Sequence, residues 1–92
     1  MQEVLSKRPD SSEPLDGAQF IELRLADIGP DGEYPSFWVT ETFAQWDAAN
    51  RRIMWDDPQL YSFKTLEDAR DWYKERRRVL AEQGFFYSDM DW

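Results

Sequence analysis

The sequence predicts an α+β fold: a small antiparallel β-sheet of three to four strands, packed by one long C-terminal α-helix, with an aromatic C-terminal tail folded back. Two observations indicate the sheet. Apolar and polar residues alternate through "QFIELRLAD", and "SFWVTETF" is rich in the β-branched and aromatic residues that strands favour. A third observation indicates the helix, because a capped stretch with helical apolar spacing follows them.

Length and composition support a single folded domain. The 92 residues leave no room for a second core, and aromatic residues make up 16% of them, including five Trp. A chain this aromatic has enough apolar surface to offset its ordering entropy, unlike a disordered chain. We therefore expect a flexible N-terminal lead-in at residues 1–17, followed by a single α+β domain at residues 18–92. Within the lead-in, Val4 and Leu5 are a poor anchor, and Pro, Ser and Gly interrupt any periodicity.

The two strands have clear faces. In the first, Ile21, Leu23 and Leu25 alternate with Phe20, Glu22, Arg24 and Ala26. In the second, Phe37, Val39, Glu41 and Phe43 lie opposite Trp38, Thr40 and Thr42. The segment "GPDGEYP" between them contains two Gly and two Pro, so the chain must turn there.

Residues 42–52 are ambiguous, because Phe43, Trp46, Ala49 and Ile53 would also share one side of a helix. We favour a hairpin with a turn at Asp47 to Asn50, since Asn tolerates the left-handed conformation that such turns need. A third strand then runs through Ile53 and Trp55. The segment "DDPQ" marks another turn, and "LYSF" forms an edge segment or a short fourth strand.

The helix is predicted over Leu66 to Gln83. Thr65 is a suitable N-cap, Glu67 and Asp68 lie where the helix dipole favours anions, and Gly84 supplies a stop. Its apolar stripe consists of Leu66, Ala69, Trp72, Tyr73, Val79 and Leu80. Phe85, directly after the stop, should pack back on Leu80 or Val79.

The rest of the tail predicts an interaction. Beyond Ser88, apolar Met90 and Trp92 alternate with Asp89 and Asp91, the pattern of a strand with one apolar and one charged face. Such a strand can add to a sheet edge in its own chain or in another chain. We favour its own chain or a dimer mate.

The chemistry available to an enzyme is limited. There is no Cys and no His, which removes the thiolate, the commonest general base and the commonest metal ligands. Asp56 and Asp57 are a weak metal or acid/base signal, because adjacent strand residues point to opposite faces and Asp57-Pro58 favours a turn. We predict no catalytic residues, no metal and no cofactor.

Charge and hydropathy bear on location and partners. The net charge is −8 and the pI is near 4.4, which argue against direct nucleic-acid binding. No apolar run approaches the roughly 20 residues that a membrane helix needs, and no leader sequence is evident. We expect a cytoplasmic protein with no membrane partner.

One stretch departs from this acidic character. Residues 64–83 hold six basic and five acidic residues, against five basic and fourteen acidic in the remainder. Arg70, Lys74, Arg77 and Arg78 form one helical stripe that could grip an acidic partner. The alternative is a solvated face with ordinary pairs such as Asp71 with Lys74 and Arg78 with Glu82.

The aromatic residues suggest a further surface, because one helix covers only one face of the sheet. Phe20 and one of Phe37 or Trp38 then lie on the other face and need another cover. We predict a non-enzymatic protein-interaction or regulatory module that uses an acidic surface and an aromatic patch, with a protein partner or a second copy of itself. The alternative is an acidic nucleic-acid mimic. The predicted partner-binding residues are Phe20, Trp38, Tyr87, Met90, Trp92, Arg70, Lys74, Arg77 and Arg78.

Overall fold

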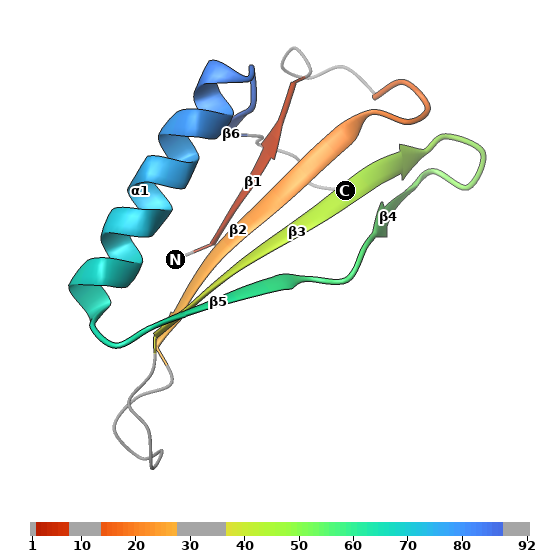
Figure 1. Ribbon diagram of the computed structural model, residues 1–92. Coiled ribbons are helices and arrows are strands. Elements are labelled where there is room, and N and C mark those ends of the chain that lie inside the picture. Colours follow the sequence, from red (N-terminus) through yellow and green to blue (C-terminus); the bar gives the residue numbers. More distant parts are fainter. Residues whose placement is uncertain (1, 8–13, 28–36, 88–92) are drawn as a thin grey trace.

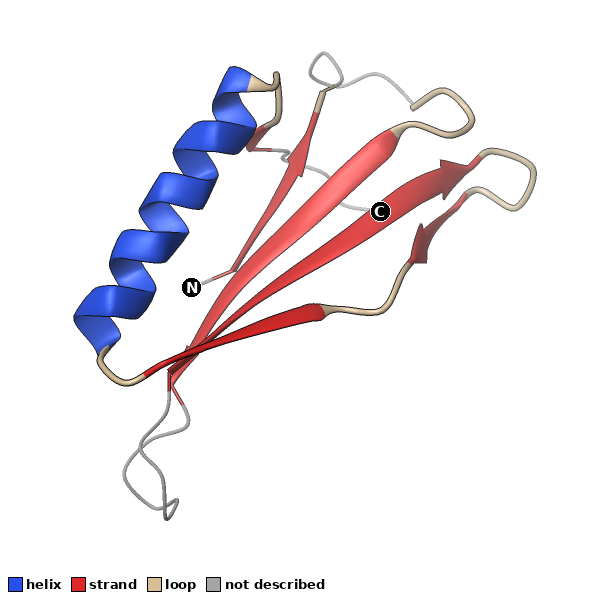
Figure 2. Ribbon diagram, viewed as in Figure 1, coloured by secondary structure: helices blue, strands red, loops and turns tan. Residues whose placement is uncertain are grey.

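The computed structural model describes residues 2–7, 14–27 and 37–87 and shows one helix lying across one face of an antiparallel sheet (Figure 1). The elements in chain order are β1 (Gln2–Ser6), β2 (Gln19–Asp27), β3 (Phe37–Asp47), β4 (Arg52–Trp55), β5 (Gln59–Phe63), α1 (Leu66–Glu82) and β6 (Phe86–Tyr87). The strand order is β4-β3-β2-β1-β6, and β5 pairs with β3 beyond the end of β4. The α+β class is confirmed (Figure 2). The described residues form a sheet of six strands rather than three to four.

The core between sheet and helix follows the alternation of β2 and β3. Ile21, Leu23 and Leu25 of β2 are buried against Ala69, Tyr73 and Leu80 of α1, together with Val39 of β3. Antiparallel pairing places Leu25 directly opposite Val39 and Ile21 opposite Phe43, so one face of the hairpin is continuously apolar except at Glu41. The predicted faces of both strands are confirmed.

A second, smaller cluster lies on the face away from the helix. It consists of Phe20, Ala44 and Trp46, with Val4, Ala18 and Ile53 packed against it. Phe20 is fully buried there. The ring therefore belongs to the core, and the prediction that it forms part of an exposed partner-binding patch is wrong.

The hairpin interpretation of residues 42–52 is confirmed. β3 and β4 pair from Ala44 with Trp55 to Asp47 with Arg52. The Asp47 carboxylate accepts hydrogen bonds from the side-chain Nδ2 of Asn50 at 2.7 Å and from its backbone N–H at 3.4 Å. The left-handed position falls on Arg51, with φ of 52°, and not on Asn50 as expected. Asn50 instead closes the turn through its side chain.

The two ends of α1 form as predicted. Thr65 Oγ1 accepts a hydrogen bond from the Asp68 N–H at 3.1 Å, which caps the N-terminus. At the other end Gly84 has φ of 92°, its N–H donates to Ala81 O, and the Phe85 N–H donates to Leu80 O at 2.9 Å. These are the two bonds of a Schellman motif. Phe85 is buried in the same core cluster as Leu80, so its predicted packing is confirmed.

The N-terminal segment differs from expectation. Gln2–Ser6 was assigned to a flexible lead-in, but it forms β1, which lies between β2 and β6. Its register pairs Leu5 with Ile21, and Leu5 is fully buried. The local pattern of β1 is weak because only Val4 and Leu5 are apolar, and they point to opposite faces. Long-range pairing with β2, rather than local sequence, makes this segment a strand.

The tail can be compared with expectation only at its start. β6 pairs Phe86 with Ser6 and Tyr87 with Leu5, which adds a two-residue strand beside β1. Residues 88–92, with Met90 and Trp92, lie outside the described residues. The folded-back tail therefore stays a prediction.

Candidate functional site

One candidate surface is the outer edge formed by β4 and β5, which we call the aromatic edge and define as Met54, Trp55, Asp56, Asp57 and Leu60. Within the described ranges, both strands pair only with β3, so their outer sides carry backbone groups with no strand partner. Three large apolar side chains are exposed there: Met54 by 47%, Trp55 by 46% and Leu60 by 60%. Unpaired backbone and exposed apolar side chains thus occur along the same edge.

The register gives the geometry of the aromatic edge. Trp55 lies opposite Ala44 and Leu60 opposite Thr40, so both side chains are on the sheet face away from the helix. Trp38 is half-buried on this same face. Asp56 and Asp57 are exposed between the two strands, so the apolar side chains are flanked by negative charge.

The second candidate surface is a groove of about 380 Å³ beside the helix, lined by Glu3, Arg70, Tyr73, Lys74 and Arg77. We call these five residues the basic groove. Tyr73 Oη donates a hydrogen bond to Glu3 Oε1 at 2.8 Å, and Arg77 Nε donates to Glu3 Oε2 at 3.1 Å. Burial and then the Glu3 carboxylate raise the pKa of the Tyr73 hydroxyl, so it stays protonated as the donor.

Charge in the basic groove is unbalanced. Both oxygens of Glu3 are already engaged by Tyr73 and Arg77, and three cationic side chains face this one carboxylate. Arg70 and Lys74 are exposed and form no ion pair with another residue in the described part of the chain. The groove is therefore a positive site on an acidic protein.

The structure divides the predicted basic stripe. Arg70, Lys74 and Arg77 share the basic groove, whereas Arg78 pairs with Glu75 and Glu82 on the exposed side of α1. The Glu75 carboxylate, with help from Glu82, raises the pKa of the Arg78 guanidinium. The solvated-face interpretation thus describes Arg78, while the other three cations form a concave site.

Between the two surfaces, an ion pair joins helix and sheet. Arg76 donates to Glu41 through Nε at 2.5 Å and Nη2 at 3.1 Å, and Glu41 is almost fully buried. Arg76 is not among the site residues predicted from the sequence. The signal was present, because Glu41 occupies an inward position between Val39 and Phe43, where a carboxylate requires a buried cationic partner.

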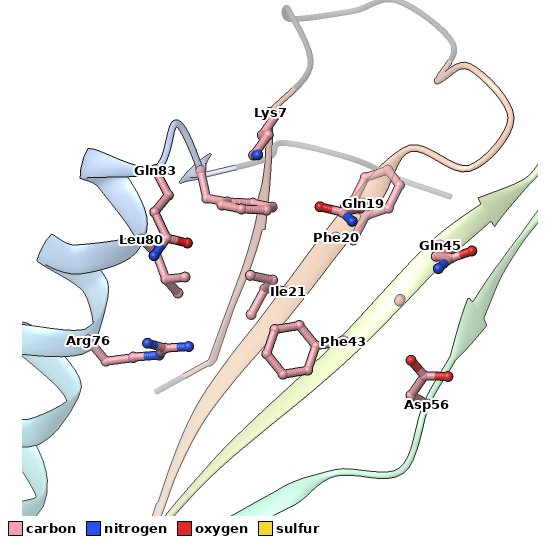
Figure 3. Close-up of a pocket in the computed structure, with 12 residues that line it drawn as sticks. Lys7, Gln19, Phe20, Ile21, Phe43, Gln45, Asp56, Arg76, Leu80 and Gln83 are labelled. Carbon is pink, nitrogen blue, oxygen red and sulfur yellow. The ribbon is translucent and has the colours of Figure 1, made fainter.

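A cleft of about 250 Å³ opens where the helix ends above β2 and β3 (Figure 3). Arg76, Leu80 and Gln83 of the helix face Ile21, Phe43 and Gln45 of the sheet across it. Lys7 lies at its rim, with Nζ 4.8 Å from the centre of the Phe85 ring. Asp56 is the only carboxylate among the described lining residues, so these residues offer no pair of acid/base groups.

The remaining predicted site residues are separated. Tyr87 is 58% exposed in β6, at the opposite side of the sheet from the aromatic edge. Trp38 lies beside the aromatic edge, and Met90 and Trp92 lie outside the described residues. Among the described residues, Trp38 and Tyr87 therefore do not share one patch. Met54, Trp55 and Leu60, which were not among the predicted partner-binding residues, are exposed along the aromatic edge, with Trp55 and Leu60 on one sheet face and Met54 on the other.

Residues 2–7, 14–27 and 37–87 contain neither a candidate metal site nor a membrane-spanning helix. No group of three or more acidic, His or Cys side chains in these ranges could hold a metal ion. No helix in these ranges is long and apolar enough to cross a membrane. No protein-family model, curated protein or solved structure matches the chain.

Proposed function

We propose that this protein is a non-enzymatic protein-interaction module whose aromatic edge binds an extended segment of a partner protein. The observation that carries the proposal is the exposure of Met54, Trp55 and Leu60 along strands whose outer backbone has no described strand partner. Strand addition uses those backbone groups for affinity and side-chain contacts for specificity. Trp is also enriched among the residues that dominate binding energy.

The charges of the aromatic edge favour a partner segment of particular chemistry. Asp56 and Asp57 flank the apolar side chains, so the segment should combine apolar anchors with Lys or Arg. A second copy of the same edge is less favourable, because strand pairing around Pro58 would bring four aspartates together. A basic, apolar segment of another protein avoids this repulsion between aspartates. We place this interaction in the cytoplasm, as the sequence predicts.

The experiment is selection from a displayed library of short random peptides on the purified full chain. We expect enriched peptides to alternate apolar residues with Lys or Arg. Trp55→Ala with Leu60→Ala should abolish capture while leaving the thermal midpoint nearly unchanged, because both side chains are exposed. Leu15→Ala is the matched control, since Leu15 is strongly exposed and lies outside this edge.

Two results would contradict the proposal. One is enrichment that the double variant does not affect. The other is a self-associated protein whose dimer dissociates in the double variant, which would make the edge a homodimer interface. The acidic mimic is the better description if the protein binds a basic nucleic-acid-binding protein, if this binding weakens steeply with salt, and if Trp55→Ala with Leu60→Ala leaves it unchanged.

A further inference from the structure

The basic groove borders a length of β1 whose outer edge has no strand partner in the part of the chain that the structure describes. β1 pairs with β2 along all of Gln2–Ser6, but β6 pairs only with Leu5 and Ser6. Along Gln2–Val4, the side of β1 away from β2 has no strand partner among the described residues. In an antiparallel strand, alternate residues direct their N–H and C=O groups to each side. This stretch can therefore pair with one more extended segment.

The cations of the groove lie on the helix flank that faces β1. Tyr73 and Arg77 reach Glu3 of β1, whereas Arg76 and Trp72 are directed to the other side of the helix, toward β3 and β5. Arg70 and Lys74 lie on the same flank as Arg77, because all three line the groove with Glu3. A strand added to Gln2–Val4 would run beside these side chains.

The spacing of Arg70 and Lys74 along α1 is close to the spacing of alternate residues in a strand added to β1. Four residues of an α-helix rise about 6 Å, which separates Arg70 from Lys74 along the helix axis. Two residues of a β-strand advance about 6.5 Å, and residues two apart share a face. Carboxylates at alternate positions of an added strand therefore have nearly the same spacing as Arg70 and Lys74, with which they could form charge-assisted hydrogen bonds.

We infer that the basic groove and the adjoining edge of β1 form a second docking site, which binds an extended acidic segment of a partner protein with Asp or Glu at alternate positions. This site lies at the β1 side of the sheet and does not depend on the function proposed for the aromatic edge, which lies at the β4 side. The basic groove binds an acidic segment, whereas the aromatic edge binds a basic one.

A peptide fits this site better than a nucleic acid. The open backbone groups of Gln2–Val4 can form a ladder only with another polypeptide. The net charge of −8 repels a long polyanion beyond the groove itself, whereas a short acidic segment contacts mainly the local cations. Glu3, in the floor of the groove, further favours discrete carboxylates near Arg70 and Lys74 over a dense phosphate chain.

The test uses two fluorescent peptides of identical composition, one with Asp and Val alternating and one with the Asp residues grouped at one end. Anisotropy titration of the full chain should show tighter binding of the alternating peptide, by about fivefold or more. Methylation of the backbone nitrogens on one edge of that peptide should abolish binding, because the ladder with β1 needs those donors. Equal binding of the two isomers would overturn the inference.

A charge-matched pair of variants locates the site. Arg70→Ala with Lys74→Ala should weaken the alternating peptide by about tenfold or more, whereas Lys64→Ala with Arg78→Ala removes equal charge elsewhere and should change it less than about threefold. All four side chains are exposed, so both variants should keep the wild-type thermal midpoint. An equal loss in both variants would mean that net charge alone drives binding and would overturn the site.

Other occupants are distinguished in the same assay. Inorganic phosphate or a single-stranded oligonucleotide that binds the groove more tightly than the alternating peptide would overturn the inference in favour of a phosphate site. Asp89→Asn with Asp91→Asn tests the chain's own tail as the occupant. Unchanged peptide affinity supports a partner segment, and a gain of about tenfold would show that the tail competes for the groove and overturn it.

Discussion

The two sides of the sheet present different surfaces to a partner. At the β4 and β5 side, large apolar side chains are exposed and aspartates flank them. At the β1 side, the open backbone is bordered by three cations of α1 and has no exposed large apolar residue among Gln2–Val4. The two edges lie at opposite sides of the sheet (Figure 1). The β4 and β5 edge is suited to contacts through apolar area, whereas the stretch Gln2–Val4 is suited to contacts through charge, although Phe86 and Tyr87 of β6 are exposed beyond it.

This difference bears on how a small sheet with two exposed edges could avoid pairing with a second copy of itself. Natural edge strands are protected by charged residues and Pro, which oppose pairing between identical copies. Asp56, Asp57 and Pro58 are the residues of this kind at the aromatic edge, and the cations of the basic groove are those at β1. In the two proposed interactions each such charge would also favour a partner of the opposite charge, so protection and specificity would have the same physical origin.

The largest effect on stability should come from breaking the ion pair between Arg76 and Glu41, which lies between the two edges. Arg76→Met leaves Glu41 buried without its partner, which should lower the free energy of unfolding by about 3–5 kcal/mol, measured by urea denaturation. Glu41→Met combined with Arg76→Met should recover most of that loss, because no charge is then buried alone. If the double variant is no more stable than Arg76→Met, the pair contributes more than charge compensation.

Arg76→Met should also destabilise α1 more than the β3 and β4 hairpin. Arg76 holds α1 on β3, and the basic groove exists only while α1 lies beside β1. Hydrogen exchange of Arg76→Met should therefore show a larger loss of protection in α1 than in the β3 and β4 hairpin. Equal loss in both regions would mean that they open as one cooperative unit.

A smaller effect is expected from Phe85→Ala. Phe85 is buried beside Leu80 and precedes β6, which ends the pairing along β1. Phe85→Ala should lower the free energy of unfolding by at least about 1.5–3 kcal/mol, which is the free energy gained by burying a Phe side chain, as measured by thermal or urea unfolding. Exposed Phe86→Ala is the matched control and should cost less than about 0.5 kcal/mol. Equal costs would show that Phe85 does not contribute through burial.

Salt should distinguish the edges in binding. Raising NaCl from about 0.05 to about 0.5 M shortens the screening length and should weaken the acidic peptide at the basic groove several-fold. A basic, apolar peptide at the aromatic edge should change less, because buried apolar area contributes most of its affinity. The same salt dependence at both edges would remove the distinction between them.

The smallest effect concerns the turn that joins β3 to β4. The hydrogen bonds from Asn50, which the ionised form accepts best, lower the pKa of Asp47 below the ordinary value of about 3.9. A lowered pKa stabilises the fold above the unfolded pKa, and this contribution is lost as pH falls through the folded pKa. Between about pH 5 and pH 3, the thermal midpoint of Asp47→Asn should therefore fall slightly less than that of the wild type. An identical fall would show that the turn does not depend on this charge.

The sequence by itself determined the local features of the molecule. The alternation in β2 and β3 established which residues face the helix, and Thr65 and Gly84 established where α1 begins and ends. Asp47 and Asn50 are close enough in the chain to form their turn without help from the rest of the fold. These features could be predicted because the residues that form them are neighbours in sequence.

The tertiary structure alone decided the features that depend on distant residues. β1 is a strand because β2 pairs with it, and Leu5 is buried because Ile21 lies opposite. Glu41 and Arg76 are 35 residues apart, and Glu3 and Arg77 are 74 apart, so no local pattern relates them. The full burial of Phe20, the exposure of Trp55 and the division of the basic stripe likewise follow from which elements pack together. Strand order and helix placement determine which surface covers each side chain. Both depend on contacts between residues far apart in the chain, so a local pattern does not predict them.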